Sequence, residues 1–391
     1  MSPLSHLART ARSSAVRDLL RLTERPDVLS LAGGLPTLEL LPVDALAAAT
    51  ASVLARHGAA ALQYGPTEGI GALRELAAAR LGHRATAATT IVTTGSQQGL
   101  DLVARCLLDP GDVVVTEVPT YLGALGALHW SGARVVGVDG DAAGLRTGEL
   151  EERLRAGLRP KLVYVVADFA NPTGATLDTA RRSHLAALAE QYGFVVVEDD
   201  PYGALRWRGE RLAPVRAWSD RVVTLGTASK VLAPGLRVGW LTAPDWLAGA
   251  ITIAKQGADL HTSTLNQWLV HDLLADRGWF DAHVAALVAT YESRCTTLVD
   301  ALTRDGVVEI AAPDGGMFVW CALGDPSVGT SALLGEALEH GVAFVPGAAF
   351  RPDGADDHRL RVCFTTLDPA QLDEAAARLA AAAGAVVSPA R

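Results

Sequence analysis

The segment from Thr227 to Trp240 holds the residues best suited to covalent chemistry. Lys230 lies there on a loop between two predicted buried strands, and burial favours the neutral amine that can condense with an aldehyde. The hydroxyls of Thr227 and Ser229 precede this lysine, and Arg237 follows it by seven residues. These groups are suited to charge-assisted hydrogen bonds with a phosphate. An isolated Ser-Lys pair, however, is more often part of a solvated loop.

An acidic turn follows the predicted strand at Phe194–Glu198. Ligands of open α/β sheets bind beyond the carboxyl ends of the strands, which is where Asp199 would lie. Pyridoxal phosphate carries both an aldehyde and a phosphate, and a carboxylate can keep its pyridine nitrogen protonated. Tyr202 could bond an oxygen on the same ring. An ordinary turn at Asp200-Pro201 explains these residues equally well.

Two glycine-containing turns complete the set of candidate residues. In Thr93–Gly99 a predicted strand stops at Gly95, just before a helix. Backbone N–H groups and the positive helix end would form a phosphate cradle there, although the spacing matches neither a P-loop nor a dinucleotide fingerprint. In Asn171–Gly174 the turn preferences of Asn, Pro and Gly explain the sequence without any function.

Alternating strand and helix patterns between residues 60 and 245 must position these side chains. They predict an α/β unit, a large domain whose mostly parallel seven-stranded sheet is covered by helices. One helix is expected over Thr179–Tyr192, with Asp178 as its N-cap and Gly193 as its stop. The predicted strands are Ile91–Thr94, Val113–Thr116, Val135–Val138, Leu162–Val166, Phe194–Glu198, Val222–Leu225 and Val238–Leu241.

The pattern changes after about residue 280. A long helical segment, short strands around Gly316–Ala322 and Arg359–Phe364, and a helix from Pro369 predict a smaller α+β domain. We therefore expect three parts of the chain. Residues 1–45 would form an N-terminal arm that packs on the small domain or on a neighbouring subunit, residues 46–285 the large cofactor-binding domain, and residues 286–391 the small domain.

The composition excludes several classes of function. The chain has 391 residues, of which 49% are hydrophobic and 20% charged, as in an ordinary globular protein. Its net charge of -9 argues against nucleic acid and anionic membrane surfaces as partners. The four cysteines are far apart, so neither disulfides nor a metal site are indicated, and core thiols are expected. Because we find no secretory signal, and because the longest late apolar run, Leu379–Val387, is far short of the roughly 20 residues of a membrane span, a cytoplasmic protein is predicted.

Taken together and in order, the chemical segments match those of a known family. The segments are Gly95–Gln98, Asn171–Gly174, Asp199–Tyr202, and Ser229–Lys230 with Arg237. The chain thereby resembles fold-type I pyridoxal-phosphate enzymes, most closely the class I and II aminotransferases of the 2-aminoadipate and kynurenine branch. The resemblance runs from Ser30 to Phe364. It implies a pyridoxal-phosphate enzyme that moves an amino group between an L-amino acid and a 2-oxo acid by a ping-pong mechanism.

The resemblance also implies a role for each matching residue. Lys230 would hold the cofactor covalently and move the substrate's α-proton, and Asp199 would pair with the pyridine nitrogen. Tyr121 would stack on the ring. Arg361, assisted by the backbone at Gly34, would bind the substrate carboxylate. The other contacts to cofactor or substrate would come from Ser96, Gln97, Asn171, Tyr202, Thr227, Ser229 and Arg237.

Two further residues matter for subunit contacts and for specificity. Tyr64 resembles a tyrosine that reaches the phosphate of the partner subunit, which implies a homodimer with shared active sites. Arg17 could present its charge to a distal substrate carboxylate, but an exposed helix charge is the simpler interpretation. His129, His261 and His340 are expected to be structural.

Three alanines depart from the family pattern beside the expected cofactor. Ala167 stands where a proline is usual, Ala170 where an amide residue is common, and Ala228 where an aromatic residue is common. Either they enlarge the pocket or the cofactor wall repacks around them. Asp168 is expected at a solvent-facing strand end.

Two alternative functions remain compatible with these residues. Elimination, replacement, decarboxylation or ring formation at an amino acid would use the same Lys230, Asp199 and phosphate site. A transcription regulator can carry an effector-sensing domain of the same fold. The early start of the matching region at Ser30 and the net charge of -9 argue against that regulator.

Overall fold

The computed structural model describes residues 3–10, 27–304, 308–355 and 358–387 of the chain. In these residues the largest element is an eight-stranded sheet with the order β2-β9-β8-β7-β6-β3-β4-β5. Strands β8, β7, β6, β3 and β4 pair in parallel, whereas β2, β9 and β5 join in antiparallel fashion. The strands are β2 (Thr90–Thr93), β3 (Val113–Val118), β4 (Arg134–Asp141), β5 (Gly144–Leu145), β6 (Leu162–Val166), β7 (Val195–Asp200), β8 (Val222–Thr227) and β9 (Gly239–Thr242).

The sheet therefore confirms the α/β prediction and adds one strand to it. Strand β5 has two residues, too few for the alternating pattern that identified the other strands. Its residue Leu145 pairs with Gly140 of β4. The strand extends the edge of the sheet away from the segments that carry the candidate chemistry.

Helices cover both faces of this sheet, and the alternation of buried residues shows which helix lies where. Val163 and Val165 of β6 pack with α7 (Thr147–Arg155) and α8 (Thr179–Tyr192). Tyr164 and Val166 point to the opposite face. That face also receives α5 (Ser96–Leu107) and α6 (Leu122–Ser131), so side chains there can meet the start of α5.

Helix α8 begins and ends as predicted. The Asp178 carboxylate accepts a hydrogen bond of 2.7 Å from the Arg181 backbone N–H, which satisfies a donor left free in the first turn. Gly193 ends the helix with a φ of +80°, a conformation that glycine adopts without strain. Because caps act over three or four residues, the sequence alone identified both limits.

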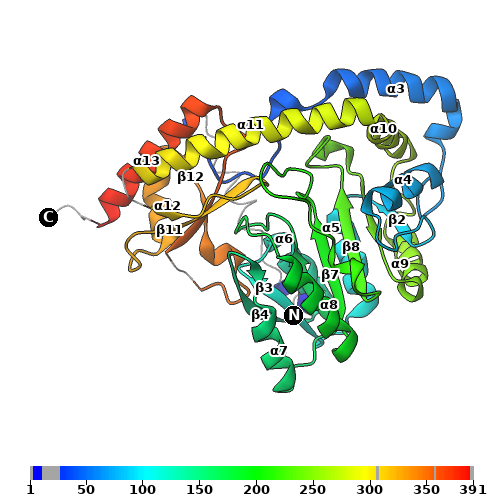
Figure 1. Cartoon of the computed structure of the whole chain (residues 1–391), viewed down its shortest axis with the longest axis horizontal. Coiled ribbons are helices and arrows are strands. Elements are labelled where there is room, and N and C mark those ends of the chain that lie inside the picture. Colours follow the sequence, from blue (N-terminus) through cyan, green and yellow to red (C-terminus); the bar gives the residue numbers. More distant parts are fainter. Residues whose placement is uncertain (1–2, 11–26, 305–307, 356–357, 388–391) are drawn as a thin grey trace.

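The C-terminal region forms a second, smaller sheet. Its order is β10-β11-β14-β13, and all of its pairs are antiparallel. The long helix α11 (Arg277–Arg304) runs along the top of the molecule in Figure 1, from α3 and α10 to the C-terminal helix. Since α11 passes continuously through residue 285, the domain limits at 45 and 285 stay a prediction. The remaining elements are β10 (Val308–Ile310), β11 (Phe318–Leu323), α12 (Thr330–Glu339), β13 (Val345–Pro346), β14 (Arg359–Cys363) and α13 (Pro369–Val387).

The N-terminal residues contact both the large sheet's covering helices and the C-terminal region. Strand β1 (Leu29–Ser30) pairs in parallel with β12 (Val342–Ala343) of the C-terminal region. In the short helix α1 (His6–Thr10), the Leu7 carbonyl lies 3.3 Å from Nε2 of His129 in α6. The segment that follows β1 thus passes between the two sheets before it reaches α3 (Val43–His57).

One helical stretch in the described ranges has the length and apolar composition to cross a membrane by those two criteria alone. It spans Leu38–Leu62, which comprises the short 3-10 helices η1 (Leu38–Leu40) and η2 (Gly58–Leu62) with α3 between them. Only 11% of its most apolar window is buried within this chain. Helix α3 lies against α10 (Thr264–Ala275), at the end of the molecule farthest from α13 (Figure 1). Its outer face is therefore an uncovered apolar surface; α4 (Gly71–Leu81) and α9 (Asp245–Ala258) complete this end.

Candidate active site

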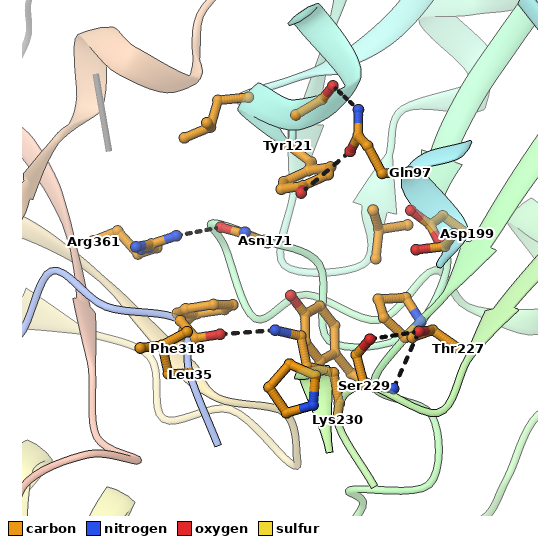
Figure 2. A pocket seen from close by; sticks show the side chains of 18 of the residues that line it. Leu35, Gln97, Tyr121, Asn171, Asp199, Thr227, Ser229, Lys230, Phe318 and Arg361 are labelled. Atoms are coloured by element: carbon orange, nitrogen blue, oxygen red, sulfur yellow. Dashed lines mark hydrogen bonds between the residues drawn. The ribbon is translucent and has the colours of Figure 1, made fainter. Parts of the chain in front are cut away.

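A cavity of about 390 Å³ lies where the carboxyl ends of the parallel strands meet the smaller sheet. Strands β6, β7 and β8 contribute to its wall from one side, and β11 and β14 contribute from the other. Figure 2 shows the side chains converging on it. Its lining includes nearly all the predicted site residues, namely Gly34, Ser96, Gln97, Tyr121, Asn171, Asp199, Tyr202, Thr227, Ser229, Lys230, Arg237 and Arg361.

Lys230 lies just beyond β8, in the loop where the sequence analysis placed it. Its Nζ donates a hydrogen bond of 2.8 Å to the backbone carbonyl of Gly34. Burial lowers the pKa of Lys230 to about 8, because the ammonium loses hydration that this neutral carbonyl only partly replaces. A substantial fraction of the amine is therefore neutral and nucleophilic near physiological pH.

Asp199 reaches the same cavity from the end of β7. One carboxylate oxygen, Oδ2, accepts a hydrogen bond of 2.9 Å from the hydroxyl of Tyr164. The other oxygen, Oδ1, is buried and has no hydrogen-bond partner. Burial raises the pKa of Asp199 to about 7, while the Tyr164 hydrogen bond favours the ionised form. The free oxygen is thus ready for a donor that a ligand would bring.

The start of α5 forms an anion site beside Lys230. Gly95 has a φ of +85°, and a side chain there would collide with the Arg237 guanidinium. Arg237 Nη2 donates a bond of 3.1 Å to the Thr94 carbonyl. The Thr227 hydroxyl lies 3.0 Å from that of Ser229. A guanidinium, two hydroxyls and a helix N-terminus thus surround one end of the cavity.

Tyr121 forms part of the cavity wall. Its ring lies where a side chain on Gly123 would be, so glycine leaves room for it. Gln97 contacts both residues. Its Nε2 donates a hydrogen bond of 2.8 Å to the Gly123 carbonyl, and its Oε1 lies 3.5 Å from the Tyr121 hydroxyl. Tyr202 lies in the cavity wall and packs edge-on against Phe318, with ring centroids 5.8 Å apart.

Arg361 is a buried cation at the opposite end of the cavity. Although a lone arginine in a strand pattern is usually a surface charge, Arg361 is only 2% exposed. The guanidinium lies 4.3 Å from the centre of the Phe318 ring. Its Nη1 donates a hydrogen bond of 2.9 Å to Asn171 Oδ1. Its Nη2 bonds the carbonyls of Ala32 and Gly33, at 2.6 and 2.9 Å. These hydrogen-bond partners of Nη1 and Nη2 are neutral oxygens, so an incoming carboxylate would meet an uncompensated charge.

Comparisons with known proteins decide the family. The model of aminotransferase class I and II matches residues 26–379. The chain belongs to this family. This aminotransferase is 40% identical to aromatic-amino-acid aminotransferase 1 of Thermococcus litoralis, over 94% of this chain and 91% of the relative. It is also 40% identical to 2-aminoadipate transaminase of Thermus thermophilus, over 94% of this chain and 93% of that relative.

A solved structure resembles this aminotransferase along almost its whole length. The kynurenine aminotransferase of Pyrococcus horikoshii superimposes with a TM-score of 0.92 at 36% identity, covering 99% of this chain and 98% of that one. These comparisons establish a pyridoxal-phosphate transferase that moves amino groups between amino acids and oxo acids. They do not favour the alternative reactions at an amino acid.

The cavity fits the cofactor of this aminotransferase. The unpartnered Oδ1 of buried Asp199 matches the N–H of a protonated pyridine. The partly neutral amine of Lys230 matches an aldehyde. The anion site at Ser96 and Arg237 matches a phosphate. Three chemically different groups of the cavity therefore correspond to the ring nitrogen, the aldehyde and the phosphate of pyridoxal phosphate.

Of the two remaining predicted site residues, one lies outside the cavity and the other outside the described residues. Tyr64 does not line the cavity: its side chain is 77% exposed and meets His261 edge-on, with ring centroids 5.6 Å apart. Arg17 falls outside the described residues. Their predicted contacts with a partner subunit and with a distal substrate carboxylate therefore stay predictions.

The prediction for Asp168 was wrong. This residue is 6% exposed, and its Oδ1 lies 2.5 Å from Arg206 and 3.0 Å from Arg182. Arg206 also lies over the Phe169 ring, 4.5 Å from its centre. A strand end adjoins solvent only if nothing packs on it, and here two arginines from distant parts of the chain cover it.

The three alanines beside the cofactor site do not enlarge the cavity. Ala167, Ala170 and Ala228 are all buried in the hydrophobic core, and none of them lines the cavity. The Ala167 carbonyl accepts a bond of 2.9 Å from Arg182. Their positions support the second of the two interpretations, in which the wall has repacked.

The sequence analysis did not assign a role in the site to Tyr164, which bonds Asp199 behind the cavity wall, or to Phe318, which lines the cavity. Tyr164 was assigned only to a buried strand, and Phe318 only to a C-terminal strand. Tyr164 carries the one hydroxyl in an otherwise aliphatic strand, which is a signal that a buried partner is required. Phe318 gave no such signal, because an aromatic residue in a strand is ordinary core material.

The histidines and cysteines that were expected to be structural do not line the cavity. A ring nitrogen of His261 and one of His340 lie 2.8 and 3.0 Å from the carbonyls of Thr262 and Glu336. All four cysteines are free thiols, three of them buried and Cys106 half-buried.

Proposed function

We propose that the cavity is the catalytic site at which this aminotransferase binds pyridoxal phosphate and transfers an amino group from an L-amino acid to a 2-oxo acid in a ping-pong cycle. One observation carries the proposal. A single cavity brings together the amine of Lys230, the unpartnered oxygen of Asp199 and the uncompensated charge of Arg361. From Asp199 to Arg361 these groups span more than 150 residues of chain.

The residues divide the chemistry among them. Bound pyridoxal phosphate supplies an electron-withdrawing ring next to the reacting carbon. Asp199 keeps the ring nitrogen protonated, and Asn171 with Tyr202 bonds the ring oxygen. Lys230 removes the α-proton and later returns it, because burial brings its pKa to about 8, near the working pH.

The substrate enters between Arg361 and the ring site. Arg361 binds the α-carboxylate in a bidentate manner, with the backbone at Gly34 beside it. The remaining wall carries the apolar side chains of Leu35, Leu122 and Phe318. We therefore expect amino acids with an apolar or aromatic side chain to be preferred, in line with the aromatic-amino-acid aminotransferase among the relatives.

We also propose that two copies of this cytoplasmic chain form a homodimer with shared active sites. Leu38, Val43 and Leu62 are at least two-thirds exposed on the apolar stretch that includes α3, which a second copy would cover. Tyr64 follows this stretch directly and is 77% exposed. A partner seated on α3 would thus receive Tyr64 near its own phosphate site.

Substitution of Lys230 tests the assignment. Lys230→Ala should abolish both turnover and the visible absorbance of bound cofactor, because no other amine lines the cavity in the described part of the chain. Lys161→Ala is the matched control, since Lys161 lies on the surface near Asp112, 3.7 Å away. Retention of the absorbance by Lys230→Ala would refute the assignment.

Candidate amino donors added without an oxo acid should convert the cofactor band once and then stop.

A further inference from the structure

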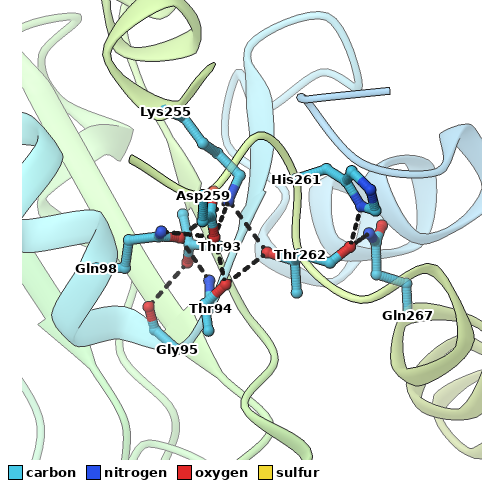
Figure 3. A network of polar contacts seen from close by, with 9 residues as sticks. All are labelled: Thr93, Thr94, Gly95, Gln98, Lys255, Asp259, His261, Thr262 and Gln267. Carbon is cyan, nitrogen blue, oxygen red and sulfur yellow. Dashed lines mark hydrogen bonds and ion pairs between the residues drawn. The ribbon is translucent and has the colours of Figure 1, made fainter. Parts of the chain in front are cut away.

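A second buried lysine lies outside the cavity. The chain has 34 Lys and Arg residues but only three lysines, and Lys255 in α9 is fully buried. Its Nζ donates to both carboxylate oxygens of Asp259, at 2.8 and 3.0 Å, one helical turn further on. Figure 3 shows this pair at the centre of a polar network. Neither side chain lines the cavity, so neither acts on substrate directly.

One side of the network holds the turn that begins the anion site. Gln98 Oε1 accepts bonds from Lys255 Nζ at 2.9 Å and from the Thr94 backbone N–H at 2.7 Å. Asp259 Oδ2 accepts from the Thr94 hydroxyl and from Gln98 Nε2, both at 2.7 Å. Since Arg237 holds the Thr94 carbonyl, every polar group of Thr94 is fixed. The direction of the next backbone N–H groups, at Gly95 and beyond, depends on these bonds.

The other side of the network reaches the segment that carries Tyr64. Lys255 Nζ lies 3.2 Å from the Thr262 hydroxyl, and the Thr262 carbonyl lies 2.8 Å from Nδ1 of His261. The Gly65 backbone N–H donates a hydrogen bond of 3.4 Å to Nε2 of His261. A neutral histidine with its proton on Nδ1 satisfies both bonds at once. The Tyr64 ring rests against this histidine.

Stability alone is a weak reason for such a pair. Burying a lysine costs hydration, and a buried ion pair is often no more stabilising than apolar side chains of similar volume. A compact ammonium that makes four polar contacts does, however, fix the geometry of everything bonded to it. Two segments are fixed here, the turn at Thr94 and the segment at Gly65. In the proposed function, the first binds the phosphate of its own subunit and the second reaches the phosphate of the partner.

We infer that Lys255 and Asp259 are positioning residues for the cofactor phosphate. They hold the turn Thr94–Ser96 in its anion-binding geometry, and they tie that turn to the Gln63–Gly65 segment that serves the partner subunit. The inference rests on the proposed function in taking the start of α5 as the phosphate site and the Gln63–Gly65 segment as the one that serves the partner subunit. Its specific consequence is that the pair matters for the phosphate and not for the rest of the cofactor.

The test compares pyridoxal phosphate with pyridoxal, which lacks the phosphate. Binding of each to the cofactor-free full chain is followed by visible absorbance in wild type, Lys255→Met and the control Arg153→Met. Arg153 forms an i,i+4 ion pair with Glu149 on α7 that is solvent-exposed at the arginine and does not line the cavity. Lys255→Met should weaken pyridoxal phosphate about tenfold, the effect of losing one charge-assisted bond, and leave pyridoxal and the control unchanged.

The outcomes separate the inference from the proposed function. Equal weakening of both ligands, or no weakening of either, would overturn the inference while wild-type binding still supports the site. Wild type that binds neither ligand would overturn the proposed function itself. Should Lys255→Met fail to fold, Thr94→Val leaves the Lys255–Asp259 pair in place, removes the hydroxyl contacts to Asp259 and Thr262, and should still weaken pyridoxal phosphate selectively, by about threefold.

Discussion

At the scale of single residues, the pairing of Asp199 with Tyr164 determines how well the cavity holds a cationic ring. Burial favours the neutral acid, and the Tyr164 hydroxyl at 2.9 Å favours the carboxylate, with the result that the pKa of Asp199 lies at about 7. The tyrosine also occupies Oδ2 and leaves Oδ1 free for the ligand. One hydroxyl thus affects both the charge and the orientation of the acid.

Replacement of this hydroxyl should shift the pH dependence of cofactor binding. In Tyr164→Phe the pKa of Asp199 should rise further, so fewer molecules carry the carboxylate at pH 7. Affinity for pyridoxal phosphate should fall about three- to tenfold at pH 7 and recover toward pH 9. Titration of apoenzyme between pH 6 and 9 measures this, with Tyr192→Phe in α8 as control. Superimposable pH profiles for Tyr164→Phe and wild type would contradict the role.

At the scale of elements, the contact between β3 and β4 contains a buried acid that the mechanism does not use. Glu117 of β3 is 4% exposed, and its Oε1 has no hydrogen-bond partner. A side chain at Gly140 of β4 would collide with it, so glycine makes its burial possible. Burial, reinforced by the charge of Asp141, raises the pKa of Glu117 to about 8. The strand pair therefore holds a proton at neutral pH.

This raised pKa implies a definite sign for the pH dependence of stability. The folded chain binds the Glu117 proton more tightly than the unfolded chain, whose value is near 4.5. Its contribution is fully present below that value and is lost as the pH rises through about 8. Glu117→Gln should therefore be more stable than wild type at pH 9, by on the order of 4 kcal/mol, since the pKa rises by roughly three units and each unit is worth about 1.4 kcal/mol.

Urea unfolding at pH 5.5 and pH 9 checks this expectation. The gain from Glu117→Gln should shrink toward pH 5.5, where wild type also carries a neutral side chain. Glu152→Gln, at an exposed position of α7, should change stability by the same small amount at both pH values. A gain from Glu117→Gln that is equal at both pH values would show that titration is not its cause.

At the scale of the whole molecule, one chain holds an almost complete site and also an uncovered apolar end. The cavity lies between the two sheets, whereas α3 lies at the far end beside α10 (Figure 1), and Tyr64 follows the apolar stretch that includes α3. Within one subunit Tyr64 does not reach its own cavity. A shared arrangement of two subunits accounts for both features.

Hybrid dimers test whether active sites are shared. Lys230→Ala and Tyr64→Ala chains, unfolded together and refolded as a mixture, should regain activity that neither variant has alone. In the hybrid, one site would then contain both substitutions and the other site neither, so up to about one quarter of wild-type activity is expected for random pairing of equal amounts. If Tyr64 served its own subunit, each hybrid site would carry one defect and mixing would restore nothing.

The sequence by itself determined the elements and the order of the chemical segments. The limits of α8, the seven longer strands and the loop position of Lys230 follow from alternation and caps, which act between residues close in the chain. The family-specific residues also lie in short linear segments. Twelve of the predicted site residues therefore line the cavity as expected.

Only the tertiary structure decided which charges are buried and what they meet. Arg361 contacts the Ala32 carbonyl across 329 residues, and Lys230 contacts Gly34 across 196. Asp168, Tyr164 and Lys255 likewise acquire their roles from partners that no local pattern identifies. The physical reason is that hydration and pKa depend on everything packed around a group, and that packing exists only once the whole chain has folded.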